Sequence, residues 1–476
     1  MFLQRFYHDG LAQASYMIAC QATGEALVVD ANRNLEPYLS TAAAQSFRIT
    51  HVTETHIHAD YVSGSRDLAK RTRAKLLLSA EGGSDWQYAF AQEDGATLLH
   101  DGEVFRLGKV EIRVVHTPGH TPEHLTFLIT DTAGSNQPMG ALTGDFIFVG
   151  DVGRPDLLER AAGIVGTMRD NARQLFDSLQ RFANAYPDHL QIWPGHGAGS
   201  ACGKALGAVP TSTLGYEKLS NWALQIRDAD AFVQEVLETQ SDPPPYFGRM
   251  KHVNRAGPSP LTSLSAPARQ AASVLPEVMA RGAFVVDLRP TASFARGGIP
   301  GTLNLPLNTS FVARAGWLLP YEGDTYLIAG DDGDLVASAA ARELHLIGIE
   351  NVRGWFGPDV FDSASLPANQ TVAMVTATET ARRVQAGSAT VIDVRNADEW
   401  RMGHISGSRH IPLGRLAEQV QQLPRDRQVV LTCATGGRSA IAASLLLKHG
   451  ISNVANMEGG YAAWQAAGLP VTLDAT

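Results

Sequence analysis

The chain is poor in cysteine, with only Cys20, Cys202 and Cys433 among 476 residues. This small, odd set cannot form a disulfide framework, so each cysteine is interpreted as a thiol. Long apolar runs are also absent, and no stretch approaches the roughly 20 apolar residues that a membrane span needs. Arg5 and Asp9 interrupt the apolar start, which argues against a secretory signal. The sequence therefore predicts a cytoplasmic protein that does not act at a membrane.

Runs of basic residues are missing as well. Lys and Arg together number 39 against 48 Asp and Glu, which gives a net charge of -9. This balance argues against binding to nucleic acid or to anionic membrane surfaces, and it favours small-molecule chemistry. A hydrophobic content of 44% is that of an ordinary globular protein. The length predicts about two to four domains.

Histidines and acids gather in three short segments of the first half of the chain. His56 and His58 lie in one segment, His120 ends a second and Asp145 ends a third. Two imidazoles and one carboxylate that leave coordination positions open are typical of non-haem Fe(II) oxygen chemistry. His56, His120 and Asp145 supply this set, so we predict one Fe(II) per chain. The alternative is that they are structural histidines with satisfied hydrogen bonds.

Further residues are candidates for the surroundings of the metal. His58 is either a fourth ligand or a group that orients water or substrate. We expect Asp60 and His196 to hydrogen-bond to the ligands and not to bind a second ion, because Tyr61 offers no imidazole. Cys202 follows His196 closely and is a candidate relay or regulatory thiol.

Secondary structure in this region is expected to alternate. Apolar segments of strand length, such as residues 26–29 and 110–115, alternate with turns and helical segments up to about residue 200. A helix is expected over residues 63–73, with Ser63 or Ser65 as its cap. Strands that end in ligands and continue into helices indicate an α/β domain.

The end of this region shows a different pattern. Apolar spacing predicts one amphipathic helix over residues 217–239. Residues 256–268 are rich in proline, glycine and serine, which suits a linker.

The remainder of the chain contains an internal repeat. Residues 284–289 and 390–395 both read as a buried strand that ends in Asp-x-Arg. Residues 297–307 match residues 403–413 at the same offset. The sequence therefore predicts two copies of one α/β domain, here called the middle repeat (269–365) and the C-terminal repeat (370–476).

The C-terminal repeat contains a cysteine between a strand and a helix. The pKa of a cysteine falls from about 8.5 at a helix N-terminus beside cationic groups. Two glycines let successive N–H groups turn inward, and an arginine adds positive charge. Such a loop would stabilise a thiolate or a cysteine persulfide, whereas a buried structural cysteine or a phosphatase loop are the alternatives. The loop comprises Cys433, Ala434, Thr435, Gly436, Gly437 and Arg438.

The middle repeat lacks this cysteine. Its corresponding strand runs into Gly330, which is followed by Asp331, Asp332 and Asp334. These acids would repel a thiolate or a sulfite ion, so we expect this repeat to be a spacer or packing partner.

These motifs together resemble a known family. Residues 1 to about 255 resemble the persulfide dioxygenase branch of the metallo-β-lactamase fold, whose iron ligands map onto His56, His120 and Asp145. The segment Gly153-Arg154-Pro155-Asp156 is similar to the Gly-Arg-x-Asp segment of that branch. One departure is Tyr61, which stands where the superfamily motif has a histidine that helps to hold a second metal.

With its repeat, the whole chain resembles fusions of persulfide dioxygenase and rhodanese from bacterial sulfide detoxification. The resemblance implies an α/β fold: an N-terminal metallo-β-lactamase αβ/βα sandwich followed by two rhodanese-like domains. It places the sandwich at residues 1–255, the linker at 256–268, a rhodanese-like domain without its cysteine at 269–365 and a rhodanese domain with Cys433 at 370–476. It also implies a homo-oligomer.

The resemblance implies that a low-molecular-weight persulfide, RSSH, is oxidised by dioxygen and water to a thiol and sulfite. Sulfite could then accept the sulfur carried on Cys433 to give thiosulfate, or thiosulfate could charge Cys433 in the reverse direction. The sequence leaves this direction open, and it leaves the carrier open among glutathione, coenzyme A and cysteine.

Two other functions remain alternatives. One is a dizinc thioester hydrolase of the glyoxalase II type, which uses metal-activated water and which Tyr61 disfavours. The other is a non-enzymatic sulfur carrier or sensor, in which Cys433 holds a persulfide and the metal domain is structural.

Overall fold

The computed structural model divides the chain into two compact units, one of residues 1–264 with 345–348 and one of residues 265–344 with 349–476. Parts of the expected linker (256–268) and the expected end of the middle repeat at 365 lie outside the described residues, so the four domain bounds stay a prediction. No described helix is both long and apolar enough to cross a lipid bilayer. The described residues are 1–160, 166–204, 206–238, 240, 242–260, 266–362 and 369–473.

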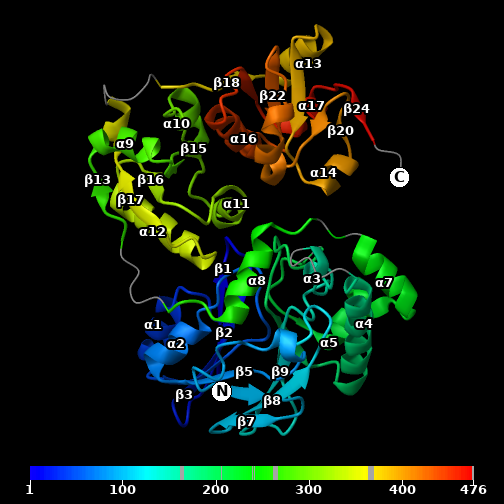
Figure 1. Ribbon diagram of the computed structural model, residues 1–476. Helices are drawn as coiled ribbons and strands as arrows, with labels where there is room; N and C mark the ends of the chain where they lie inside the picture. Colours follow the sequence, from blue (N-terminus) through cyan, green and yellow to red (C-terminus); the bar gives the residue numbers. More distant parts are fainter. Residues whose placement is uncertain are drawn as a thin grey trace. The chain divides into compact units, whose positions relative to one another are not determined.

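Two six-stranded sheets form the centre of the first unit (Figure 1). The order in the first sheet is β1 (Phe2–His8), β2 (Gln13–Cys20), β3 (Glu25–Val29), β4 (Arg48–Thr53), β5 (Lys75–Ser79) and β6 (Thr97–Leu99). The order in the second sheet is β12 (Ser212–Thr213), β11 (Gln191–Pro194), β10 (Gly140–Gly144), β9 (Leu125–Asp131), β8 (Val110–His116) and β7 (Val104–Leu107).

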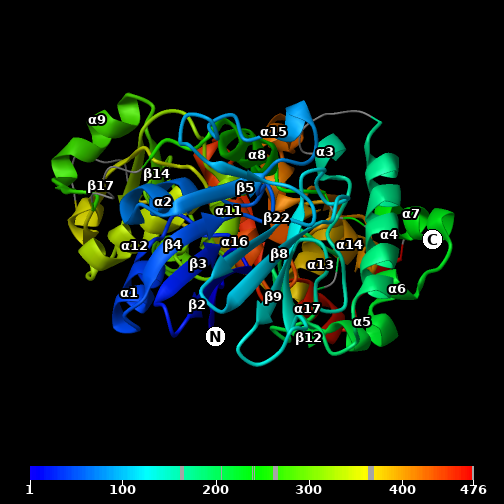
Figure 2. The same ribbon diagram turned by 90° about the horizontal axis from the view of Figure 1, so that it is seen from below.

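Helices cover the outer face of each sheet (Figures 1 and 2). Helices α1 and α2 pack on the first sheet, whereas α4 to α7 pack on the second. The helices and turns of the unit are α1 (Glu36–Ala44), α2 (Ser65–Thr72), η1 (Ser84–Trp86), α3 (Leu157–Arg160), α4 (Met168–Ala185), α5 (Leu214–Ser220), α6 (Trp222–Gln225), α7 (Ala229–Glu238) and α8 (Tyr246–Ala256).

Side-chain alternation along the strands explains these layers. Leu27 of β3 belongs to the core between the two sheets, together with Phe127 and Trp193 of the second sheet. Its neighbour Val28 faces the other way, into the core under α1 and α2. Because successive strand residues point to opposite faces, one strand serves both cores. The predicted αβ/βα sandwich is confirmed.

The expected helix over residues 217–239 was wrong. It is divided into α5, α6 and α7, with a first break at Asn221. The side chain of Asn221 accepts a hydrogen bond from the backbone N–H of Ala223 and starts α6. Asparagine competes with helical backbone bonding in this way, and the apolar spacing did not reveal it.

The expected helix over residues 63–73 exists, and Ser63, one of the two expected caps, accepts a hydrogen bond from its first residue although Gly64 holds the N-cap position. Helix α2 begins at Ser65 after Gly64, which has no side chain to cap it. The Ser63 hydroxyl accepts a hydrogen bond from the Ser65 N–H at 3.1 Å and donates one to the Glu54 carboxylate. Ser63 therefore satisfies the first N–H of the helix from the residue before the N-cap.

The second unit contains two five-stranded parallel sheets (Figure 1). Both have the same order, β13-β17-β16-β14-β15 in the middle repeat and β18-β23-β22-β19-β21 in the C-terminal repeat. The middle repeat has β13 (Arg269–Gln270), η2 (Ala272–Val274), α9 (Leu275–Ala280), β14 (Phe284–Asp287), α10 (Thr291–Arg296), β15 (Leu303–Asn304), α11 (Phe311–Leu318), β16 (Thr325–Ile328), α12 (Gly333–Leu346), β17 (Val352–Phe356) and η3 (Pro358–Asp362).

The C-terminal repeat adds a small antiparallel pair, β20 with β24, to the same plan. Its elements are β18 (Ala373–Val375), α13 (Ala377–Gln385), β19 (Ala389–Asp393), α14 (Ala397–Arg401), β20 (His404–Ile405), β21 (Arg409–His410), η4 (Leu413–Arg415), α15 (Leu416–Gln419), η5 (Val420–Gln422), β22 (Gln428–Thr432), α16 (Gly437–Lys448), β23 (Val454–Met457), α17 (Gly460–Ala466) and β24 (Val471–Thr472).

The Asp-x-Arg motif has the same structural role in both repeats. Arg289 forms an ion pair with the buried Asp287 and donates to the carbonyl of Gly297 at 3.0 Å. Arg395 pairs with the buried Asp393 and donates to the carbonyl of Gly403 at 2.8 Å. In each repeat the motif ties the end of the second strand to the loop ahead of the third. The repeat seen in the sequence is therefore a repeat of structure.

Candidate metal centre and cysteine loop

The three predicted metal ligands follow the ends of three strands in the first unit. His56 lies in the loop after β4, His120 in the loop after β8 and Asp145 directly after β10. All three are almost fully buried. Because β4 belongs to one sheet and β8 and β10 to the other, the packing of the two sheets brings the three loops together.

The ligand atoms of this group face one another. Asp145 Oδ2 lies 3.8 Å from His56 Nε2 and 3.5 Å from His120 Nε2. Neither carboxylate oxygen of Asp145 has a hydrogen-bond partner among the described residues. A buried carboxylate without partners is costly unless a cation compensates it. The group His56, His120 and Asp145 therefore fits a metal ion.

Hydrogen bonds behind the histidines fix their orientation. His120 Nδ1 lies 2.9 Å from the carbonyl oxygen of Arg154, which can only accept, so Nδ1 carries the proton and Nε2 is free. Burial lowers the pKa of His120 to about 3, so its ring is neutral at pH 7. Neutral imidazole is the form that binds metals.

The segment Gly153-Arg154-Pro155-Asp156 contains the carbonyl group that accepts the hydrogen bond from His120. The Arg154 guanidinium is fully buried and donates to both carboxylate oxygens of Asp156, each at 2.8 Å. A Cβ atom on Gly153 would lie 1.8 Å from the carbonyl oxygen of Asp145, so only glycine fits there. Arg154 thus has a local carboxylate partner, and its backbone holds a ligand.

One ring nitrogen of His58 contacts Asp30 and not the three-residue group. Its Nε2 lies 3.1 Å from Asp30 Oδ1, and its Nδ1 has no hydrogen-bond partner among the described residues. Burial disfavours its charged form, but Asp30, Glu54 and Asp60 together outweigh burial and raise the pKa of His58 to about 9. Tyr61 stacks against His58, with ring centroids 4.5 Å apart, and its hydroxyl donates to the Asp30 carbonyl. Both interpretations of His58, as a fourth ligand and as a group that orients water or substrate, stay predictions.

Asp60, His196 and Cys202 form a second buried group that could hold a metal ion. His196 Nε2 lies 3.4 Å from Asp60 Oδ2 and 3.5 Å from Asp145 Oδ1. Asp145 therefore lies between the two groups, with one oxygen facing each. Burial, together with Asp60 and Asp145, raises the pKa of the Cys202 thiol well above its usual value. The prediction of a single metal stays a prediction.

Sequence reasoning missed two residues that organise the centre. Asp30 accepts hydrogen bonds from the backbone N–H and the hydroxyl of Thr55 and has a left-handed backbone, with φ of 57°. His124 Nε2 accepts from the backbone N–H of Asp145 at 3.1 Å. Asp30 could have been found because it directly follows a buried strand. His124 could have been found because it lies four residues after His120.

The Cys433 loop lies in the C-terminal repeat between β22 and α16. Cys433 Sγ accepts hydrogen bonds from the backbone N–H of Gly436 at 3.1 Å and from the Ser439 hydroxyl at 3.4 Å. Burial opposes ionisation of the thiol, but these donors outweigh it and lower the pKa of Cys433. The loop therefore favours an anionic sulfur at this position.

Arg438, the predicted cation of the loop, is already paired. It donates to both carboxylate oxygens of Glu399, each at 2.6 Å. Glu399, followed by Cys433, raises the pKa of Arg438. The positive charge that Arg438 brings is therefore largely compensated within the protein, which the sequence did not indicate.

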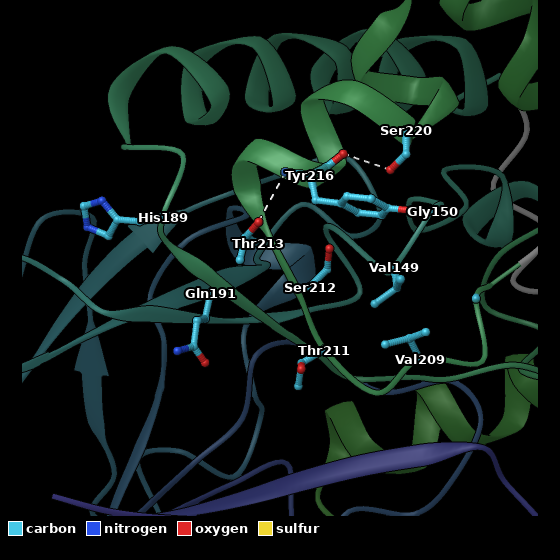
Figure 3. Close-up of a pocket in the computed structure, with 11 residues that line it drawn as sticks. Val149, Gly150, His189, Gln191, Val209, Thr211, Ser212, Thr213, Tyr216 and Ser220 are labelled. Carbon is cyan, nitrogen blue, oxygen red and sulfur yellow. Dashed lines mark hydrogen bonds between the residues drawn. The ribbon is translucent and has the colours of Figure 1, made fainter.

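A groove of about 750 Å³ lies elsewhere on the first unit (Figure 3). Its lining residues come from β11, β12, α5 and the segments near Val149 and Val209. Tyr216 and Ser220 of α5 line one side of it, as Figure 3 shows. None of the predicted metal ligands lines this groove, so it is separate from the candidate centre.

Comparison with known proteins matches two segments of the chain to families. Residues 8–183 match the metallo-β-lactamase superfamily, and residues 376–467 match the rhodanese-like domain. A crystallised metallo-β-lactamase from Staphylococcus aureus subsp. aureus COL is 38% identical with a TM-score of 0.67. The alignment covers 75% of this chain and 99% of that chain, so it extends beyond the first unit.

Two further relatives match part of the chain. The crystal structure of ETHE1 from Myxococcus xanthus is 25% identical with a TM-score of 0.44, and the match covers 54% of this chain and 99% of that chain. A hydroxyacylglutathione hydrolase from Polaromonas sp. is 31% identical over 183 residues. That match covers 38% of this chain and 61% of the relative, so the chain spans less than two thirds of that protein's length.

The support for His120 can be tested with Asp156→Asn. Loss of the carboxylate leaves the buried Arg154 guanidinium without its charged partner and loosens the carbonyl that holds His120 Nδ1. We expect metal affinity to fall by about tenfold or more, as for other partners of metal ligands. Competition with a chelator for bound Fe(II) measures the change.

Asp230→Asn is the matched control, because it breaks an Arg–Asp pair whose side chains are 51% and 72% exposed. It should leave metal affinity unchanged. Equal affinities in the two variants would show that the Arg154–Asp156 pair does not support the metal centre.

Proposed function

Since the chain belongs to the metallo-β-lactamase superfamily and carries a C-terminal rhodanese-like domain, we propose that it is an iron persulfide dioxygenase joined to a sulfurtransferase. The substrate would be a low-molecular-weight persulfide, and the products a thiol and sulfite. The C-terminal repeat would carry sulfur on Cys433, making or using thiosulfate.

One observation carries this proposal: two imidazoles and one carboxylate face one another in the same chain as a cysteine loop built for anionic sulfur. The carboxylate, Asp145, has no hydrogen-bond partner among the described residues, which suits a ligand. Two histidines and a carboxylate leave positions for both substrate and gas. Both sites would handle sulfur as an anion, which gives a reason for their fusion.

The overall oxidation converts RSSH, O2 and water to RSH, sulfite and protons. An Fe(II) ion held by His56, His120 and Asp145 would supply electrons to dioxygen and positions for both reactants. The contribution of the chain is orientation: the Arg154 carbonyl fixes His120, and His124 fixes the backbone of Asp145. Burial of all three ligands limits access of bulk water to the reacting sulfur.

In sulfur transfer the Cys433 thiolate attacks the outer sulfur of thiosulfate. A sulfur–sulfur bond forms at Cys433, the bond inside thiosulfate breaks, and sulfite leaves with the electron pair. The Gly436 N–H and the Ser439 hydroxyl, which donate to Cys433 Sγ, would stay beside the persulfide that results. The reverse reaction uses the same groups and gives thiosulfate from sulfite.

A thioester hydrolase is the second candidate, and one observation favours it. The group Asp60, His196 and Cys202 could hold a second metal beside the first, as a dinuclear hydrolase would require. The similarity to a hydroxyacylglutathione hydrolase points in the same direction. Tyr61, packed against His58 and hydrogen-bonded to Asp30, supplies no ligand to this group.

Oxygen uptake and metal content together separate these functions. With glutathione persulfide and Fe(II)-loaded protein, we expect oxygen consumption with release of sulfite and about one iron per chain. Removal of the iron with a chelator should abolish uptake, and Fe(II) should restore it. An oxygen electrode and elemental analysis make both measurements.

Two zinc ions per chain with thioester cleavage under argon would instead establish the hydrolase. Persulfide bound on Cys433 without any oxygen uptake would establish the sulfur carrier or sensor.

Cys433→Ser should separate the two proposed activities. The variant should still consume oxygen and form sulfite from persulfide, because the metal ligands are untouched. It should lose transfer of sulfur between thiosulfate and a thiol, since the hydroxyl is a poor nucleophile at pH 7. Cys20→Ser is the control and should retain both activities. Thiosulfate turnover by the Cys433 variant at the parental rate would refute the division.

Cys202→Ser tests the relay thiol. The Cys202 side chain is almost fully buried and groups with Asp60 and His196 beside Asp145. If Cys202 relays sulfur or regulates the centre, persulfide oxidation in the variant should fall by about tenfold or more, a loss of the size seen for a positioned catalytic group. Oxygen uptake at the parental rate would remove this role from Cys202.

A further inference from the structure

Helix α11 of the middle repeat packs on η4 of the C-terminal repeat, within the second unit. The contact is close: a Cβ atom on Gly414 would lie 1.7 Å from Cε3 of Trp317. Two hydrogen bonds join the repeats nearby, from the Asn304 N–H to the Ser444 hydroxyl and from Lys448 Nζ to the Gly301 carbonyl. The middle repeat is therefore seated directly against the repeat that contains Cys433.

Arg314 lies one helical turn before Trp317 on α11. Residues three apart on a helix share a face, so Arg314 is directed toward the C-terminal repeat as Trp317 is. Its side chain is half-buried. Among the described residues, no acceptor or carboxylate pairs with the Arg314 guanidinium. An arginine is always charged, so this charge is available to a ligand.

The charged groups near Arg314 indicate where a ligand of its guanidinium would bind. Burial and Arg438 lower the pKa of Arg314, and Cys433 opposes them. Helix α11, which carries Arg314, packs on η4, and η4 packs on α16, which begins four residues after Cys433. Arg314 of the middle repeat is therefore within electrostatic range of the cysteine of the other repeat. Glu399 pairs with Arg438, whereas Arg314 has no carboxylate partner among the described residues, so Arg314 is a cation near Cys433 whose charge is not compensated by an ion pair there.

We propose that the Cys433 site is shared between the repeats, and that Arg314 binds the oxyanion end of a small sulfur-containing anion such as thiosulfate. The inference rests on the proposed sulfurtransferase function for its substrate. Thiosulfate is a dianion that must approach a thiolate, and like charges at contact repel strongly in a partly buried site. Arg314 offsets that repulsion, and its planar fork matches the oxygens of a sulfonate group.

This assigns a role to the middle repeat beyond packing. Its acidic segment at Asp331, Asp332 and Asp334 would repel an anion. Its helix α11 instead supplies a cation that, unlike Arg438 of the loop, is not paired with a carboxylate among the described residues. Sulfite leaves the site carrying the electron pair of the broken bond, and the Arg314 guanidinium is placed to hold that charge as it develops.

Arg314→Gln tests the proposal without relying on enzyme activity. Iodoacetate is an anion and iodoacetamide is its neutral counterpart, and both alkylate thiolates. The ratio of their rates at Cys433, followed by mass spectrometry of the peptide, reports the local positive charge. We expect the ratio to fall by about tenfold in Arg314→Gln, the size of one charge-assisted contact. Arg314→Lys should restore much of it, and the ratio at Cys20 should not change.

Arg281→Gln is the matched control, because Arg281 lies in the same repeat with a side chain 61% exposed and paired with Glu277. It should behave like the parent. In thiosulfate turnover, Arg314→Gln should raise KM for thiosulfate by about tenfold with a smaller effect on kcat, since the lost contact acts in binding. Thermal unfolding at the parental temperature shows that the repeat is still folded.

Two outcomes separate this inference from the proposed function. If the parent transfers no sulfur from thiosulfate but the alkylation ratio falls in Arg314→Gln, the sulfurtransferase proposal fails and the anion site stands. If the parent is active and Arg314→Gln has the parental ratio and KM, the shared site is refuted.

Discussion

The carboxylate of Asp145 is the group on which the rest of the first unit depends. It is buried, its two oxygens have no hydrogen-bond partner among the described residues, and each oxygen faces a different imidazole-containing group. Removing such a charge from water costs several kcal/mol unless a cation compensates it. The surrounding structure is arranged to hold it there: His124 binds its backbone, and Gly153 leaves room for its carbonyl. The fold therefore holds the Asp145 carboxylate in a position where a metal ion can compensate its charge.

The two repeats of the second unit share a fold but differ in the residues at the loop that follows the central strand. The Asp-x-Arg pair is retained in both copies because it ties a strand end to a loop, which any copy of the fold needs. The Cys433 loop has a different requirement, since N–H groups and a hydroxyl must converge on one sulfur, and among the described residues this arrangement is found in the C-terminal repeat. The middle repeat is free of that demand. Its surface packs instead against the C-terminal repeat, as the close contact between Trp317 and Gly414 illustrates.

Much of this could be predicted from the sequence, and the failures have physical reasons. The alternation of strands and helices predicts an α/β domain, and the resemblance to a known family implies the sandwich. The repeated Asp-x-Arg motif predicts two copies of one α/β domain. His56, His120 and Asp145 could be singled out because ligand residues follow strand ends. The contacts of Asp30 with His58 and the pairing of Arg438 with Glu399 could not, because they join segments far apart in the chain. The helix break at Asn221 was missed because apolar spacing carries no information about a side chain that bonds its own backbone.

Both candidate sites solve one electrostatic problem in different ways. A persulfide or thiosulfate sulfur is reactive as an anion, and an anion is unstable in a buried site without positive partners. In the first unit, neutral imidazoles and one carboxylate leave a net deficit of positive charge that a divalent cation fills. In the second, converging N–H dipoles stabilise the thiolate, but Glu399 cancels the nearest guanidinium. Dipoles suffice for a single charge on Cys433. These dipoles do not stabilise a second, doubly charged anion beside the thiolate. For this reason we assign Arg314, which has no partner among the described residues, to the binding of that anion as well as to the packing of the repeats.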